Sequence, residues 1–160
     1  MKEESEMSFG EILSLTHGFL GILLIVGSPW ALAELFALKD HNGIQRLKLV
    51  TLGLVIASFL SCIFLAAPTY LNYYPTAKVE INAGPNPWVH GILMETKEHI
   101  GLLEPMIVLA AAFVVWYYSD SLIQDKNARH SAIALLILGF LLAFAVMSMG
   151  AYIAKTGPIR

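Results

Sequence analysis

The side chains best suited to chemistry lie in two segments that are far apart in the sequence. One is WVHGILMETKEHIGLLEPM (residues 88–106), which contains His99, and the other is LTHGFLG, which contains His17. Two neutral imidazoles from different helices are the axial ligands of a b-type haem. Gly18 and Gly101 would leave the porphyrin room against the backbone, because glycine permits close approach. The pair therefore predicts a haem b held by His17 and His99. The alternative for His17 is a histidine hydrogen-bonded across helices or to interfacial water.

Two carboxylates accompany His99. Glu95 lies one helical turn before it on the same face and is predicted to accept the second ring N–H and fix the tautomer. Its alternative role is a solvated carboxylate at the membrane surface. Glu104, next to Pro105, falls inside an apolar run. It is predicted to carry protons or to hydrogen-bond a quinone, or else to bond a neighbouring helix or backbone groups that Pro105 leaves free.

The other three histidines give weaker patterns. His90 precedes His99 by nine residues, which places the two on opposite faces of a helix, so His90 competes with His99 for one ligand position. Its simpler role is that of an interfacial residue. His41 and His130 flank polar connectors and form a second, less favoured haem pair, and the alternative is two ordinary loop histidines.

Other site classes fit poorly. A di-iron carboxylate site needs Glu-x-x-His on two helices, and this sequence does not repeat the motif. Serine–histidine–acid groupings, phosphate loops and zinc spacings are not recognisable, and no catalytic residue is predicted. A net charge of −2 gives no basic face for nucleic acid. The single cysteine, Cys62, excludes an intrachain disulfide. The sequence therefore favours an electron-transfer subunit over a self-contained enzyme.

The elements that must position these residues are transmembrane helices. The 160-residue chain is 57% hydrophobic and 14% charged, where a soluble domain is nearer half apolar and one quarter charged. The acidic N-terminus lacks a basic region and a cleavage site, so no signal peptide is predicted. We expect one all-α domain over residues 1–160, a four-transmembrane-helix bundle with a Pro-rich loop between the second and third helices. The predicted helices span residues 9–38, 47–71, 88–118 and 130–154, and the predicted loop spans residues 72–87.

Charge distribution gives the predicted orientation. Lysines and arginines are densest in the first and third connectors, which lie close to helix ends. The positive-inside rule then places both termini and the 72–87 loop on the outer side, in an energy-transducing membrane such as the prokaryotic cytoplasmic membrane.

At the level of this pattern, the chain resembles four-helix b-type cytochrome membrane subunits. The residues that carry the resemblance are His17-Gly18, His99-Ile100-Gly101 and Arg129-His130. It is also similar, over about residues 42–152, to small four-helix membrane proteins associated with haem–copper oxidase assembly. Their histidines stand near the positions of His41, His99 and His130, although the Pro-rich loop and His17 depart from that pattern.

These observations lead to three hypotheses. The first is a bis-histidine haem b subunit that exchanges electrons with quinone or a partner redox protein. The second is a cofactor-free scaffold or assembly subunit of a respiratory-type complex. The third is a quinone-binding subunit without haem, which requires the same polar face. All three expect the lipid bilayer and other membrane or redox subunits as partners.

Overall fold

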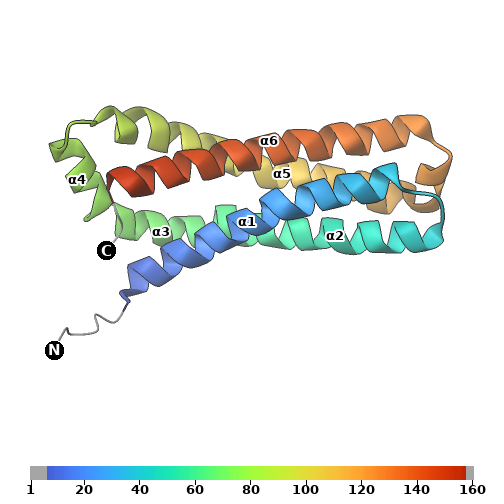
Figure 1. Cartoon of the computed structure of the whole chain (residues 1–160), viewed down its shortest axis with the longest axis horizontal. Coiled ribbons are helices and arrows are strands. Elements are labelled where there is room, and N and C mark those ends of the chain that lie inside the picture. Colours follow the sequence, from blue (N-terminus) through green and yellow to red (C-terminus); the bar gives the residue numbers. More distant parts are fainter. Residues whose placement is uncertain (1–6, 158–160) are drawn as a thin grey trace.

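The computed structural model describes residues 7–157. Nine helical segments follow one another along this part of the chain, six of them α-helices, two π-helical turns and one 3-10 turn (Figure 1). They are α1 (Phe9–Phe36), α2 (His41–Phe59), the π turn η1 (Leu60–Leu65), α3 (Ala66–Tyr73), α4 (Ala77–Ala83), the π turn η2 (Val89–Met94), α5 (Glu95–Tyr118), the 3-10 turn η3 (Ser119–Ile123) and α6 (Lys126–Thr156). The predicted absence of a signal peptide concerns residues that lie largely outside the described range.

These segments form four long antiparallel rods: α1, then α2 with η1 and α3, then η2 with α5, and finally α6. Each rod is long and apolar enough to cross a membrane. Figure 1 shows both chain ends and α4 at one end of the bundle, with the two short connectors at the other. The predicted four-helix membrane bundle is confirmed.

The interior of the bundle combines small residues with large ones such as Leu35 and Leu47, and many other large apolar residues are exposed on its outer surface. Ala31, Ala111 and Ala132 are fully buried, whereas Phe64 and Phe113 are about two-thirds exposed. Without water to drive apolar side chains inward, helices associate through close backbone approach at small residues. The large exposed side chains are the surface that lipid covers.

Helix boundaries differ from the predicted ones at both connectors. The Asn-Gly pair of the first connector lies in the first turn of α2, because the Asp40 side chain caps that helix through a 2.8 Å bond from the Gly43 N–H. The Asp125 side chain likewise starts α6 before His130, which is therefore a helical residue. The predicted long loop also contains α4. Capping residues, rather than apolar content, set these boundaries.

Candidate functional site

An interhelical cavity of about 850 Å³ lies between α1, the η1–α3 segment, α5 and α6, in the half of the bundle nearer the chain ends. Its walls are mainly apolar, and polar side chains reach it from three of the four rods. These polar side chains are Ser14, His17, Ser61, Cys62, Thr69, Tyr70, Tyr73, Lys97, Glu98 and Glu104. The volume is within the range of pockets that bind small molecules and cofactors.

Glu104 is the most deeply buried carboxyl group of the cavity, with 1% of its surface exposed. One carboxyl oxygen, Oε2, accepts hydrogen bonds from the hydroxyl of Ser58 and from the thiol of Cys62, the latter at 3.7 Å. These contacts link α5 to the α2–η1 segment across the bundle. Bonding to a neighbouring helix is one of the alternatives predicted for Glu104, and the residue also lines the cavity.

Three buried side-chain oxygens have no hydrogen-bond partner within residues 7–157: Thr69 Oγ1, Glu98 Oε1 and Glu104 Oε1. All three residues line the interhelical cavity. Leaving a buried polar group unbonded costs about 1–3 kcal/mol. Three such oxygens on residues that line one apolar cavity make this cavity the candidate site for a ligand with polar groups.

His17 lies on the α1 wall of the cavity. Its Nδ1 is 3.1 Å from the Ser61 carbonyl, to which it donates a hydrogen bond. The Ser61 hydroxyl approaches the same nitrogen at 3.2 Å. Donation from Nδ1 leaves Nε2 as the acceptor nitrogen of the neutral ring. The Ser61 contact therefore holds the imidazole in one tautomer at the cavity wall.

Lys97 is the one lysine among the residues that line the cavity. Gly150 on α6 leaves room for its stem, because a Cβ added at Gly150 would lie 3.2 Å from Lys97 Cε. No hydrogen bond or ion pair engages Lys97 Nζ in the described part of the chain. The cavity thus contains a hydrogen-bond donor, Lys97, as well as carboxylate acceptors.

Irregular backbone helps to place these groups. The π turns η1 and η2 shift the helical register, and such turns recur at functional sites. Ser61 and Cys62 lie within η1. Pro105 lacks the N–H that would bond the carbonyl of Gly101, and Gly101 lines the cavity. A Cβ added at Gly18 or Gly101 would meet nothing within 4 Å, so both predicted glycines leave open space.

The predicted ligand pair is not brought together. His17, Gly18, Gly101 and Glu104 line the cavity, but His99 is exposed and lies outside its walls. His99 Nδ1 bonds the backbone carbonyl of Glu95 at 2.6 Å, not the Glu95 carboxylate. The orienting role of that carboxylate therefore stays a prediction that this contact does not support.

A bis-histidine haem requires two imidazoles facing one iron, and the cavity walls present only His17. Within residues 7–157, no three His, Cys, Asp or Glu side chains are grouped closely enough to hold a metal ion. The residues of a single chain therefore do not fit a bis-histidine haem in this cavity. The haem remains a prediction from the sequence pattern.

The remaining histidines have other contacts. His90 Nδ1 accepts a 3.1 Å hydrogen bond from the hydroxyl of buried Tyr73, near the outer end of the cavity. His41 bonds Asp120 at 2.8 Å and Gln45 at 3.0 Å, at the opposite end of the bundle. His130 is exposed on α6. The alternatives predicted for them, an interfacial residue for His90 and loop histidines for His41 and His130, stay predictions, although His41 and His130 both lie within helices.

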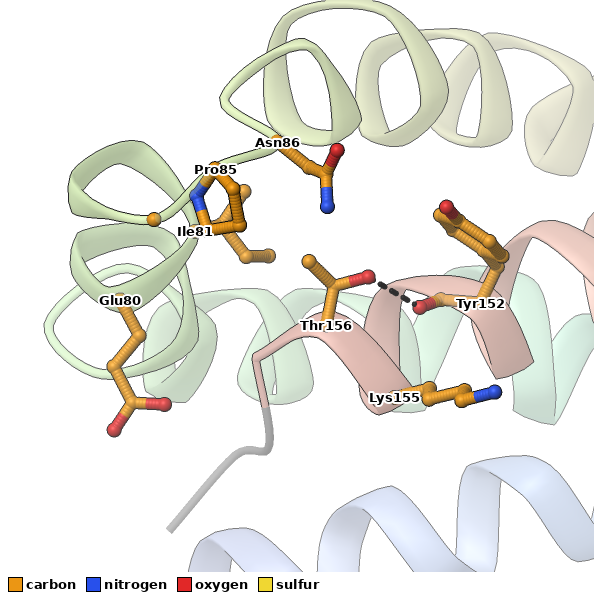
Figure 2. A pocket seen from close by; sticks show the side chains of 8 residues that line it. Glu80, Ile81, Pro85, Asn86, Tyr152, Lys155 and Thr156 are labelled. Atoms are coloured by element: carbon orange, nitrogen blue, oxygen red, sulfur yellow. Dashed lines mark hydrogen bonds between the residues drawn. The ribbon is translucent and has the colours of Figure 1, made fainter.

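A smaller hollow of about 300 Å³ lies at the end of the bundle, between α4 and the last turns of α6. Figure 2 shows Glu80, Asn86 and Lys155 around it, with the Thr156 hydroxyl bonded to the Tyr152 carbonyl at 2.9 Å. Its charged groups, Glu80 and Lys155, are exposed at the bundle surface, and its lining residues include none of the buried, unpartnered oxygens of the interhelical cavity.

Sequence reasoning did not select Ser58, Ser61, Thr69 or Lys97. A signal for the serines was present, because positions 58, 61 and 62 share one helical face in a segment that is otherwise apolar. Lys97 is preceded and followed by other polar residues, and only the packing against Gly150 distinguishes it from them.

No protein-family model, curated protein or solved structure matches this sequence. The geometry of the cavity therefore carries the functional inference.

Proposed function

We propose that this chain is a quinone-binding membrane subunit of an electron-transfer complex, with the quinone ring in the interhelical cavity. The observation that carries the proposal is the set of unpartnered oxygens of Thr69, Glu98 and Glu104 around one apolar cavity. A ligand that satisfies them must combine polar atoms with a large apolar surface. It must also reach a site enclosed by membrane-spanning helices.

The mixture of donors and acceptors favours a quinone over other amphiphiles. A quinone presents two carbonyl acceptors, and its reduced form presents two hydroxyl donors. The Lys97 ammonium and the Thr69 hydroxyl can donate to the carbonyls. The ionised or neutral carboxyl groups of Glu98 and Glu104 can accept from the hydroxyls. A site that binds both redox forms needs both kinds of group.

Electrons would come from, or pass to, a redox-active partner subunit, because a single cavity of this kind binds one carrier. His17, held by Ser61, supplies a further acceptor at Nε2 for a hydroxyl of the reduced form. Within the chain, these side chains bind and orient the ring, and the apolar walls exclude water from it.

The test is to purify the protein from its native membrane in mild detergent and quantify extracted quinone by mass spectrometry. The expected result is a stoichiometric quinone, enriched over the surrounding lipid and lost in the variant Gly101→Met, which fills the cavity. The matched control is Gly53→Met, since Gly53 also has open space at its Cβ position but lies outside the cavity. Equal quinone content in the wild type, both variants and the bulk lipid would overturn the proposal.

A second candidate is the scaffold or assembly subunit, and the exposure of His99 favours it. An imidazole on the outer surface of a transmembrane helix is expensive in lipid unless a partner engages it. In this function, His99→Ala weakens co-purification with a partner subunit and leaves quinone content unchanged. An absorption spectrum of the same preparation, oxidised and reduced, tests the predicted haem independently.

A further inference from the structure

Two rows of residues, one on α1 and one on α6, line the interhelical cavity and are also exposed on the outer surface of the bundle. We call these rows the two stripes. On α1, Leu15, Phe19 and Ile22 line the cavity, although 61%, 58% and 46% of their surfaces are exposed. On α6, the exposed residues that line the cavity are Met147, Ala151 and Ala154. The cavity is therefore not sealed between these two helices.

The spacing shows that each stripe runs along its helix. Positions 15, 19 and 22, like positions 147, 151 and 154, are separated by four and then three residues, which places each set on one face over about two turns. Since α1 and α6 are antiparallel, the two stripes delimit an elongated slot. Figure 1 shows the first half of α1 diverging from α6 at this level.

Small residues keep the slot open. Gly18 on α1 is exposed, lines the cavity and has nothing within 4 Å of the position a Cβ would take. Ala151 and Ala154 extend no side chain beyond Cβ from the facing helix. By contrast, Gly139 is buried in a close helix contact, where Val108 Cγ2 lies 3.1 Å from its Cβ position.

We propose that this slot admits the ligand laterally from the hydrocarbon layer and then holds its long apolar chain, while the ring occupies the cavity. The inference rests on the proposed quinone-binding function and specifies the ligand class further, as a quinone with a long hydrocarbon or isoprenoid chain. The slot is continuous with the cavity that contains the unpartnered oxygens, so one molecule can occupy both.

A hydrocarbon chain fits the slot better than a helix of a partner protein does. Helices pack with their axes 8–10 Å apart through interdigitating side chains on a continuous face. Here the small residues lie in a recess between α1 and α6, bordered by Phe19 and Met147. A recess of this form fits a flexible hydrocarbon chain. A hydrocarbon chain in the slot still contacts lipid, so it loses few of its apolar contacts when it moves there from the bilayer.

The experiment compares equilibrium binding of two probes to the full chain in lipid nanodiscs: a benzoquinone with a decyl chain and the same ring without it. The slot is filled by the double variant Gly18→Leu with Ala151→Leu. Because the two leucine side chains occupy the space that the decyl chain would fill, binding of the decyl probe should weaken about tenfold or more. Binding of the chainless probe should change less than about twofold, since the ring site is untouched.

The matched control is the double variant Gly53→Leu with Ala134→Leu, which adds the same atoms at exposed positions of α2 and α6 outside the cavity. It should bind both probes as the wild type does. Unchanged decyl binding in the slot variant would overturn the slot and leave the quinone site standing. Failure of both probes to bind the wild type would overturn the proposed function and the slot with it.

A third variant, Ala154→Leu, narrows only the outer end of the slot and guards against a folding defect in the double variant. Selective weakening of the decyl probe supports the proposal. Equal weakening of both probes would show that the substitution acts on the ring site, and would overturn it.

Discussion

The hydroxyl of Ser58 donates to one carboxyl oxygen of Glu104, while the other oxygen of the same carboxyl has no partner in the described residues. Ser58 is fully buried on α2, and Glu104 lies on α5. The contact therefore fixes the orientation of the carboxyl group through a neighbouring helix. Its other oxygen belongs to a residue that lines the cavity, where a bound ligand can complete the hydrogen bonding.

The first prediction concerns this carboxyl group. Glu104→Gln retains an oxygen for the Ser58 hydroxyl, so the protein should fold with nearly unchanged thermal stability. Quinone binding should weaken about tenfold, because a hydrogen bond to a charged or strongly polar group contributes about 1.5–3 kcal/mol. Thermal unfolding in detergent and binding of the chainless benzoquinone measure the two effects.

Glu104→Leu separates the structural contact from the ligand contact. It leaves the Ser58 hydroxyl buried without its acceptor and should lower the free energy of unfolding by about 1–3 kcal/mol. Adding Ser58→Ala should restore part of that loss without restoring quinone binding. If Glu104→Gln bound the benzoquinone as tightly as the wild type, Glu104 would not contact the ring.

The second prediction uses the open space at Gly101. Gly101→Met should place a side chain in the cavity without a clash and abolish quinone binding. Replacement of a helical glycine also adds about 0.8–1 kcal/mol of helix propensity. The control Gly53→Met gains the same propensity on α2 but should leave binding unchanged. Binding isotherms and unfolding temperatures are measured for both variants. Comparing them separates the effect of filling the cavity from a general effect on helix stability.

The third prediction distinguishes His17 from His99. His17→Ala removes a group held at the cavity wall by Ser61 and should weaken quinone binding by about fivefold to tenfold, the value of one ordinary hydrogen bond. His99→Ala should leave binding within about twofold of the wild type, because His99 lies outside the cavity. Equal losses in both variants would instead support a ligand that contacts both imidazoles, as the predicted haem does.

The architecture could be predicted because apolar length and breaks in hydropathy determine it. Each predicted span corresponds to one rod, including the long helix that begins near Trp88. The helix boundaries were harder to predict, because Asp40 and Asp125 extend α2 and α6 at their N-termini through capping hydrogen bonds that hydropathy does not reveal. The short helix α4 was missed because the prolines around it mask its pattern.

The site was only partly predictable, because helix rotation decides which polar residues meet. Four of the six predicted binding residues, His17, Gly18, Gly101 and Glu104, line one cavity. His99 was expected beside them because two imidazoles from different helices suit a haem, and that pattern does not specify which face of α5 points inward. A rotation of about 100° per residue separates Lys97, Glu98 and His99, so the first two line the cavity and the third does not.

The fourth prediction concerns the buried hydroxyl at the outer end of the cavity. Tyr73→Phe removes its hydrogen bond to His90 while preserving the ring, so the free energy of unfolding should fall by only about 0.5–1.5 kcal/mol. Tyr73→Ala should cost about 3–5 kcal/mol, because the ring is fully buried among α4, η2 and α6 residues. Similar losses for the two variants would show that the hydroxyl, and not ring packing, dominates.

The last prediction is a pH dependence at Tyr74, an exposed residue just beyond the second span. A hydrogen bond from Tyr70, together with the bond and charge of Lys78, lowers the pKa of Tyr74 below the ordinary tyrosine value. Lys78 Nζ lies 3.8 Å from the centre of the Tyr74 ring. Because the folded-state pKa is depressed, Tyr74 contributes to stability above the pKa of the unfolded chain. That contribution is lost as the pH falls through the folded-state pKa.

In an ultraviolet titration of tyrosinate, Tyr74→Phe should remove the first group to ionise, and Lys78→Met should shift the ionisation of that group to higher pH. A first ionisation that survives Tyr74→Phe unchanged would assign it to another tyrosine.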